Sequence, residues 1–171
     1  MASSDSAVEA LFRKAGIVRC TGREELTTVA SVFMHKPLNG RNIAIVTHAG
    51  GPAVMLTDAL SAGGMNIPKL ETADQEAILA MMNPGASAVN PIDMIATATV
   101  DQLDNVIEYA DKKLPYIDGM SVIFGNNGLT DMTEVYELLH SKINGCNKPL
   151  YPILPSISSS FRELENFMNK R

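Results

Sequence analysis

The stretch AIVTHAGGPAVMLTDAL, residues 44–60, decides the fold. AIVT at 44–47 has the composition of a buried strand, and VMLTDAL at 54–60 places apolar residues on one face of a helix. The junction between them is His-Ala-Gly-Gly-Pro, in which Pro52 is predicted to take the first helical position. Glycine loses more conformational freedom on folding than any other residue. Two glycines at this junction therefore indicate either a tight turn into a closely packed helix or a place where a ligand approaches the backbone.

The same alternation of strand and helix continues along the chain. Apolar runs predict strands at 17–20, 43–47, 120–125 and 150–154, with a weaker one at 66–70. Helical spacing of apolar residues occurs around residues 8–15, 26–33, 53–60, 78–82, 100–110, 132–143 and 161–168. Strands that alternate with helices indicate a parallel sheet, because a helix supplies the crossover that parallel neighbours need. The sequence thus predicts an α/β fold: a flavodoxin-like open parallel sheet with helices on both faces.

Several residue pairs mark where these helices begin and end. Capping-box spacing occurs at four predicted starts: Thr21 with Glu24, Thr72 with Gln75, Thr99 with Gln102, and Ser160 with Glu163. Left-handed caps are predicted at Gly16, Gly63 and Gly145. Residues 83–99 contain two prolines and a run of small residues, so this stretch is predicted to be an ordered loop.

Composition excludes several classes of function. The chain has 171 residues, of which 46% are hydrophobic, and a formal net charge of -5 with scattered lysines and arginines. Nucleic acid is not a predicted partner, because its binding needs basic patches. No apolar run approaches the ~20 residues of a membrane span, so no membrane partner is predicted. Cys20 and Cys146 lack metal-ligand spacing, which predicts no metal site and a reducing, cytoplasmic location.

Three stretches are predicted to meet at the carboxyl edge of the sheet: THAGGP at 47–52, NPID at 90–93 and FGNNGLTD at 124–131. A helix N-terminus there presents unpaired N–H groups and about half a positive charge, which can hold an anion without a lysine. The residues that could let a phosphate or carboxylate reach the backbone, or could hold it, are Gly50, Gly51, Asp93, Gly125 and Gly128.

A structural role is an open alternative at each of these positions. The Gly-Gly-Pro turn could serve packing alone, and Asp93 could cap a turn instead of holding a ligand group. His48 could be a general base or a phosphate ligand, but a histidine at a strand end is more often a hydrogen-bonded structural residue. The chain shows no Ser/His/Asp order, P-loop or paired carboxylates, so no catalytic residue is predicted in it.

The residues resemble a known family. AIVTHAGGPAVMLTDAL, NPIDMIATAT and FGNNGLTD, in this order, together with SSDSAVEALFRKAGIVRC at 3–20, resemble the NDP-forming acyl-CoA synthetases. This family includes ADP-forming acetate–CoA ligase and is related to succinyl-CoA synthetase. The resemblance lies with the C-terminal region of the CoA-binding subunit or half.

The resemblance implies an acid–thiol ligase reaction in which acyl-CoA, ADP and phosphate give the acid, CoA and ATP. In this family an acyl phosphate forms first, and a histidine then carries the phosphoryl group to a nucleotide site on an ATP-grasp domain. In the succinyl relatives the phosphohistidine is steadied by the N-termini of two helices, one from each of two flavodoxin-like domains. FGNNGLTD resembles the start of the second helix, which implies phosphate contact by Gly125, Asn126, Asn127 and Gly128. The phosphohistidine itself would lie upstream of this chain, since His48 does not match that motif. The whole enzyme would use CoA, ATP or ADP, phosphate and Mg, with nothing bound covalently.

The resemblance also implies a domain division. Residues 1–38 resemble the helix–strand–helix tail of the preceding phosphohistidine domain, and residues 40–171 the following flavodoxin-like CoA-ligase domain. The partners would be the CoA-binding and ATP-grasp domains of the same synthetase. A strand at 17–20 would then be separated from its parent sheet, so we expect it to pack on its own domain or to form a homodimer with a second copy. The chain alone is expected to be inactive.

Two other interpretations stay open. The chain could be a stand-alone flavodoxin-like module that binds an anion or a flavin phosphate, with a regulatory role. It could also be a structural dimerisation domain with no ligand.

Overall fold

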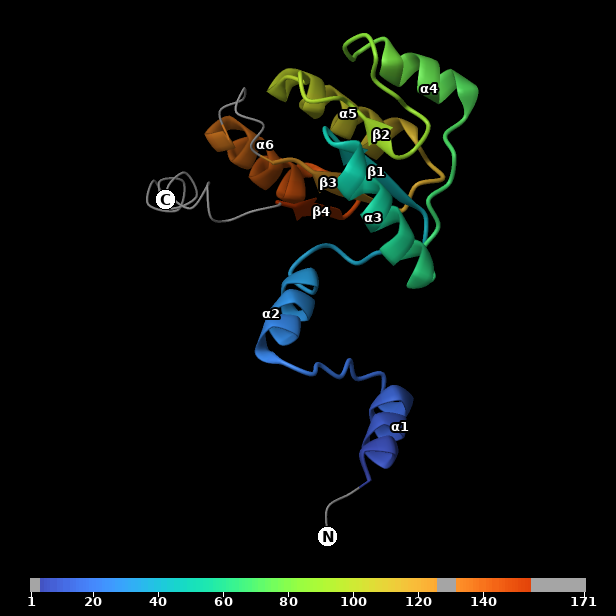
Figure 1. Ribbon diagram of the computed structural model, residues 1–171, viewed down its shortest axis with the longest axis vertical. Helices are drawn as coiled ribbons and strands as arrows, with labels where there is room; N and C mark the ends of the chain where they lie inside the picture. The colour runs from blue at the N-terminus through green and yellow to red at the C-terminus, as the bar shows by residue number, and fades with distance from the viewer. Residues whose placement is uncertain (1–3, 126–131, 155–171) are drawn as a thin grey trace. The chain divides into compact units, whose positions relative to one another are not determined.

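The computed structural model describes residues 4–125 and 132–154. The chain divides into two compact units, Met1–Met34 and His35–Arg171 (Figure 1). No helix in the described part is long and apolar enough to cross a membrane.

The first unit consists of helices α1 (Asp5–Ala15) and α2 (Arg23–Val32). The Ser4 side chain caps α1 by accepting from the Ala7 N–H, and Gly16 ends it at φ 69°, as predicted. Neither helix contains a buried residue. The exposed large apolar side chains of this unit are Leu11, Ile17, Val18, Leu26, Val32, Phe33 and Met34. The unit therefore has amphipathic helices without a core of its own.

Two predictions about the first unit are wrong. Residues 17–20 do not form a strand: Ile17 and Val18 are 53% and 55% exposed, and the described residues offer them no partner strand. A strand is stable only when its N–H and C=O groups are paired, so the apolar run alone does not produce one. The predicted capping box also fails, because Gly22 takes the N-cap position of α2. Thr21 instead donates its backbone N–H and its hydroxyl to Glu25 Oε2, each at 2.7 Å.

The second unit contains a four-stranded parallel sheet in the order β2–β1–β3–β4. The strands are β1 (Ile43–Thr47), β2 (Ile92–Asp93), β3 (Gly119–Ile123) and β4 (Leu150–Ile153). The predicted parallel α/β fold is confirmed. The prediction of a weaker strand at 66–70 is wrong, because within this range only Asn66 forms a bridge, to Asn42. The stretch 83–99, predicted to be a loop, contains β2.

Helices cover both faces of this sheet (Figure 1). On one face, α3 (Gly50–Ala62) packs on Ile43, Ile45 and Ile123. On the other face, α5 (Val100–Lys113) and α6 (Met132–Gly145) pack on Ala44, Val46, Met120 and Val122, joined by Ile78 of α4 (Thr72–Leu79). Because crossovers between parallel strands are right-handed, the direction in which the chain moves across the sheet decides which face the connecting helix covers. The chain moves one way across the sheet from β1 to β2 and the other way from β2 to β3 and β4.

The predicted helix caps of the second unit agree with the structure at some helix ends and differ from it at others. Thr99 and Gln102 form the predicted capping box, with hydrogen bonds of 3.2 and 3.0 Å. The Thr72–Gln75 pair does not, because Glu71 is the N-cap and Gln75 Nε2 donates to the Leu70 carbonyl. Gly63 has φ -77°, and the left-handed position falls one residue later, at Gly64, with φ 84°. Gly145 is the last residue of α6. The predicted helix at 161–168 and the Ser160–Glu163 pair lie outside the described residues.

Two tyrosines share one carboxylate beside α4. Tyr109 and Tyr116 donate their hydroxyls to Asp74 Oδ1 and Oδ2, at 2.9 and 2.7 Å. Burial, with a smaller contribution from the hydrogen bond to Asp74, raises the pKa of Tyr116 to about 12 from an ordinary value of 10.0.

The raised pKa of Tyr116 predicts a loss of stability in alkali. Below pH 10 the hydroxyl is protonated in both the folded and the unfolded chain, so its contribution to folding is fully present. Between pH 10 and about 12 the unfolded chain loses this proton more readily, and the free energy of unfolding falls. We expect urea unfolding to show a shallower fall over this interval in Tyr116→Phe than in the unchanged protein. Equal slopes in the two proteins would contradict the assignment.

Candidate functional site at the carboxyl edge of the sheet

The carboxyl ends of three strands meet at one edge of the second unit. Thr47, the last residue of β1, is in register with Asp93 of β2 and with Ile123 of β3. The chain leaves β1 toward a helix on one face and leaves β3 toward a helix on the other face. This arrangement is a topological switch point, the place where open α/β sheets bind their ligands.

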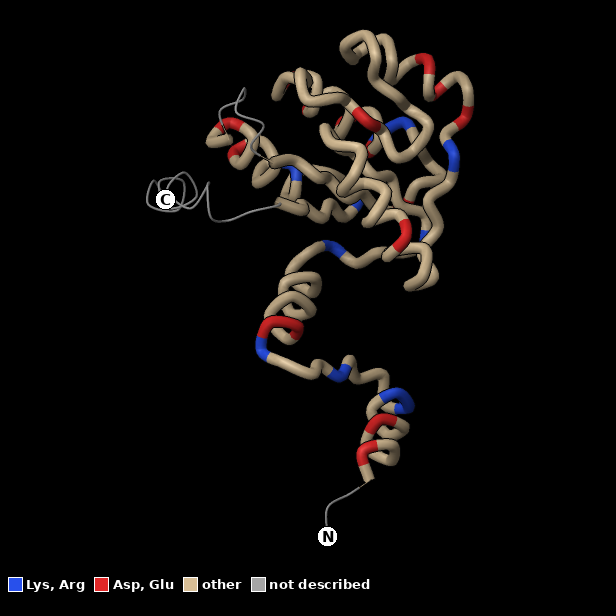
Figure 2. The backbone as a smooth tube through the Cα atoms, in the orientation of Figure 1, with Lys and Arg blue, Asp and Glu red and all other residues tan. Residues whose placement is uncertain are grey.

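The Gly-Gly-Pro turn forms the start of α3 at this edge. The helix begins at Gly50, and its N-cap residue, Ala49, makes no side-chain capping bond. Pro52 is therefore the third helical residue and not the first, which is tolerated because the first four N–H groups of a helix have no internal partner. The first turn contains no acidic residue, and Figure 2 shows no Lys or Arg on α3. An anion at these N–H groups would meet the positive end of the helix dipole.

The two glycines have different surroundings. A Cβ atom at Gly50 would lie 3.1 Å from Asp93 Oδ2, so this glycine allows the carboxylate to approach the turn. A Cβ atom at Gly51 would meet nothing within 4 Å. The packing explanation therefore accounts for Gly50. Gly51 precedes Pro52 inside the helix, where a Cβ atom would crowd the proline ring, so glycine at this position has a local steric reason as well as room for a ligand.

Asp93 serves the turn role that the sequence left open. Its Oδ1 accepts from the Ile95 N–H at 3.0 Å, and Ile95 has a φ of 58°, which β-branched residues rarely adopt. Its Oδ2 faces Gly50. The structure thus brings together two of the predicted site residues, Gly50 and Asp93.

Sequence reasoning missed the role of Asn90, which holds the outer edge of β1. Asn90 is buried, its Oδ1 accepts from the Ile45 N–H, and its Nδ2 donates to the carbonyls of Ile43 and Pro68, at 2.9–3.0 Å. The side-chain amide takes the place of a longer β2. The sequence signal was only an asparagine before a proline. In the structure Asn90 has a φ of 86°, an angle that asparagine tolerates better than most non-glycine residues.

Thr47 was also missed. Its hydroxyl accepts from the Ala49 N–H at 3.0 Å and donates to the Ala49 carbonyl at 2.9 Å. This local pairing fixes the turn before α3, and a threonine at a strand end ahead of a glycine pair was its only signal in the sequence.

His48 reaches from this turn to the end of β3. The residue is 9% exposed, and Nδ1 of its ring lies 3.3 Å from the Ile123 carbonyl oxygen. The ring stacks on Phe124, with centroids 4.4 Å apart and planes 28° apart. Gly125 follows Phe124 and is buried. The other predicted phosphate contacts, Asn126, Asn127 and Gly128, lie outside the described residues.

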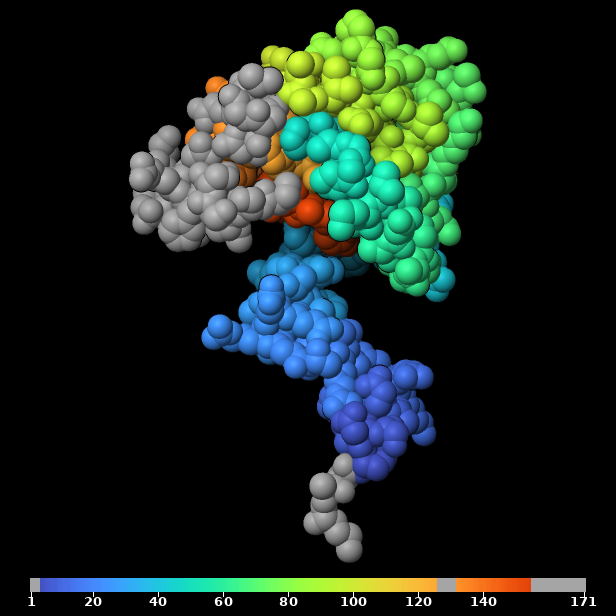
Figure 3. All heavy atoms as spheres, in the orientation of Figure 1, coloured from blue at the N-terminus to red at the C-terminus, as the bar shows by residue number. Residues whose placement is uncertain are grey.

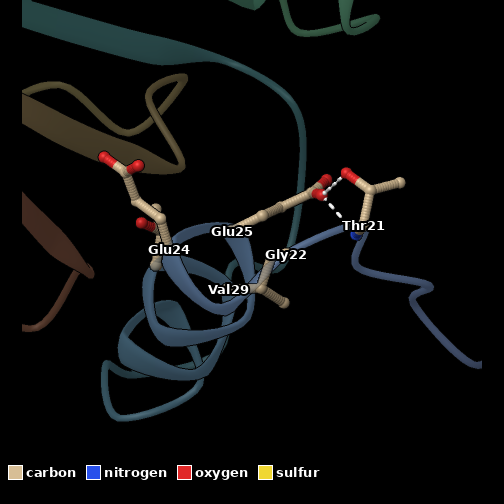
Figure 4. Close-up of a pocket in the computed structure, with 6 residues that line it drawn as sticks. Thr21, Gly22, Glu24, Glu25 and Val29 are labelled. Carbon is tan, nitrogen blue, oxygen red and sulfur yellow. Dashed lines mark hydrogen bonds between the residues drawn. The ribbon is translucent and has the colours of Figure 1, made fainter.

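Other candidate sites are weaker. In the described part of the chain no group of His, Cys, Asp and Glu could hold a metal ion. Cys146 is buried, which raises the pKa of its thiol to about 11 and disfavours a nucleophilic thiolate. A hollow of about 440 Å³ in the first unit is lined by Thr21, Gly22, Glu24, Glu25, Thr28 and Val29. Figure 4 draws these lining side chains. The two carboxylates of the hollow disfavour an anion.

Comparison with known proteins identifies relatives of the chain. No family model matches. The subunit alpha of acetate–CoA ligase [ADP-forming] II from Pyrococcus furiosus is 33% identical over 98 residues, covering 57% of this chain and 21% of its own length. The subunit alpha of ligase I from the same organism is 28% identical over 154 residues, covering 88% of this chain and 33% of its own length.

A solved structure has the same fold. The dinucleotide-forming acetyl-coenzyme A synthetase 1 of Candidatus Korarchaeum cryptofilum, in complex with phosphate and ADP, matches with a TM-score of 0.83 at 23% identity. The match covers 96% of this chain and 37% of that chain. This chain thus spans about a fifth and a third of the lengths of the two curated ligase subunits named above. The resemblance predicted from the sequence is confirmed: the chain is similar to a partial region of subunits of ADP-forming acetate–CoA ligases.

Proposed function

We propose that this chain is a part of an acid–thiol ligase that converts acyl-CoA, ADP and phosphate to the acid, CoA and ATP. Its contribution is the carboxyl edge of the sheet, where the backbone N–H groups at the start of α3 face the phosphoryl group. The observation that carries this proposal is the position of the uncapped α3 N-terminus at the switch point, with Gly51 open to solvent. Phosphate in the related Korarchaeum structure supports it.

The edge residues then have different roles. Gly50 and Gly51 present backbone amides, and the resemblance assigns the same role to Gly125, Asn126, Asn127 and Gly128. Asp93 holds its own loop through Oδ1 and lies beside Gly50 with Oδ2, and it does not hold the phosphate itself, because a carboxylate in direct contact with a phosphate would repel it. Mg²⁺ would accompany the nucleotide on another domain, since Mg²⁺ is usually bound through phosphates and few carboxylates.

The remaining domains of the synthetase supply the rest of the reaction. We assign the phosphohistidine to a preceding domain, of which residues 1–38 are the tail, and nucleotide and CoA binding to ATP-grasp and CoA-binding partner domains. Without them, the chain is expected to show no ligase turnover. The outer side of α3 is available for such contacts: Val54 and Met55 are 60% and 74% exposed, and Figure 3 shows α3 at the surface of the second unit.

Substitution of Gly51 tests the proposed phosphate site. The Cβ atom in Gly51→Val meets no atom of a neighbouring segment within 4 Å, but it precedes Pro52 in the helix, so we expect a modest fall in the midpoint of thermal unfolding. If phosphate approaches the backbone here, the valine will exclude it, and we expect its dissociation constant to rise at least tenfold. Titration of inorganic phosphate, followed by the backbone amide resonances of Gly50 and Gly51, measures this.

Gly145→Val is the matched control. Gly145 is also at a helix end with open space around its Cβ position, but it precedes β4 and so lies toward the opposite edge of the sheet. Phosphate affinity should stay within twofold in this variant. Unchanged affinity in Gly51→Val, or no phosphate-induced shifts in the unchanged protein, would count against the proposed function.

The exposed apolar residues of the first unit predict self-association when the partner domains are absent. A unit without buried residues cannot offset the entropy of ordering its helices, so a second copy is expected to cover it. Light scattering after size exclusion should give a dimer, and Leu11→Glu with Phe33→Glu should give a monomer. A monomeric unchanged protein, with fast amide exchange along residues 17–20, would refute this expectation.

A further inference from the structure

His48 connects the two stretches that are proposed to face the phosphate. It lies between Thr47, whose hydroxyl fixes the turn into α3, and Ala49, the N-cap residue of that helix. Its own side chain leaves this turn and reaches β3, where it contacts the Ile123 carbonyl and Phe124. Asp93 approaches the same turn from the β2 side. The residue before the N-cap of α3 is therefore joined to the end of β3, and Asp93 lies beside the start of the helix on the β2 side.

The partner of His48 decides its tautomer. A backbone carbonyl oxygen can only accept a hydrogen bond, so Nδ1, 3.3 Å from Ile123 O, must carry the proton. In the neutral ring, Nε2 then has the lone pair. Among the described residues, the hydrogen bond of this side chain is made by Nδ1, and none is made by Nε2. The stack on Phe124 fixes the ring plane as well.

We infer that His48 is a positioning residue of the carboxyl edge: its Nδ1–H and its stacked ring set the start of α3 relative to the end of β3. The consequence of this inference rests on the proposed function: the amides at the start of α3 and the amide of Gly125 after β3 are placed to face one phosphoryl group. The two contacts are separable. Phenylalanine keeps the ring without the hydrogen bond, and asparagine keeps an N–H donor without the ring.

The first test needs no ligand. Nitrogen chemical shifts of the imidazole of His48 in the full chain, in mildly alkaline buffer, should show a protonated Nδ1 and an unprotonated Nε2. In His48→Phe, which retains a ring over Phe124, the carbonyl resonance of Ile123 should move because its hydrogen bond is lost. The Nε2–H tautomer in the unchanged protein, or an unmoved Ile123 carbonyl in the variant, would overturn the inference.

The second test measures the consequence for phosphate. We expect His48→Ala to weaken inorganic phosphate binding about tenfold, and His48→Asn and His48→Phe each to recover part of the loss. Leu150→Ala is the matched control, since Leu150 is buried at the amino end of β4 and its loss lowers stability away from the site. Phosphate affinity equally reduced in Leu150→Ala would show that His48 acts through stability alone and would overturn its positioning role. If the unchanged protein binds no phosphate, the proposed function fails, and the ligand-free spectra still decide the role of His48.

Discussion

Replacement of Asn90 by alanine is expected to lower the free energy of unfolding by about 4 kcal/mol, since three hydrogen bonds are lost and buried β1 groups are left unpaired. The Ile45 N–H and the Ile43 carbonyl both depend on this side chain. Because Asn90 lies three residues before Asp93, the loss should also loosen the contact between Asp93 and the Gly50 turn. Urea unfolding measures the first effect, and the amide resonance of Gly50 reports the second.

Two further variants separate the causes. Asn90→Gly removes the same amide but tolerates the φ of 86°, so the difference between the glycine and alanine variants measures backbone strain. Asn66→Ala removes an exposed amide whose Nδ2 donates to Asn42, and should cost less than about 1 kcal/mol. A small effect of both Asn90 variants would mean that water or neighbouring groups satisfy β1 without the amide.

A similar loss, about 3 kcal/mol, is expected for Asp111→Ala, since its buried carboxylate organises the turn before β4. Oδ2 accepts from the backbone N–H and the Nδ2 of Asn147, each at 3.1 Å, and Oδ1 accepts from the Lys148 N–H at 2.8 Å. Lys148 Nζ in turn donates to the carbonyls of Ala110 and Leu114 at the end of α5. Thermal and urea unfolding should both register the change.

Asp101→Ala is the control for Asp111. Asp101 lies on the same helix, but it is exposed in the first turn, where its interaction with the helix dipole contributes at most about 1 kcal/mol. Equal losses in the two variants would show that helix charge, and not the turn before β4, causes the effect.

Alternation of apolar runs was enough to predict the three longer strands and the helices on both faces. Ile43 and Ile45 face one core while Ala44 and Val46 face the other, so β1 had to be apolar throughout. The strand at 17–20 was wrong because pairing depends on residues far away in the chain. The two residues of β2 were missed because Ile92 and Asp93 show no strand periodicity. Their pairing follows from the way Asn90 brings the chain to β1.

The candidate site was predictable in its location but not in its connections. Gly-Gly-Pro after a strand marked the edge, and Asp93 was found through its Asn-Pro context. The contact of His48 with Ile123 joins residues 75 positions apart, and the three bonds of Asn90 also cross long distances in sequence. Contacts of this kind depend on strand order, which a local pattern does not specify.

The short β2 has a consequence for aggregation. A sheet edge with a row of free N–H and C=O groups is a template on which foreign strands assemble into fibrils. Along the outer side of β1 the amide of Asn90 occupies these groups, and a side chain cannot propagate a ladder. At the other end of the described sheet, Pro152 removes one donor from β4. Both outer edges of the described sheet therefore disfavour the addition of further strands from other chains, although neither edge is covered by a long strand.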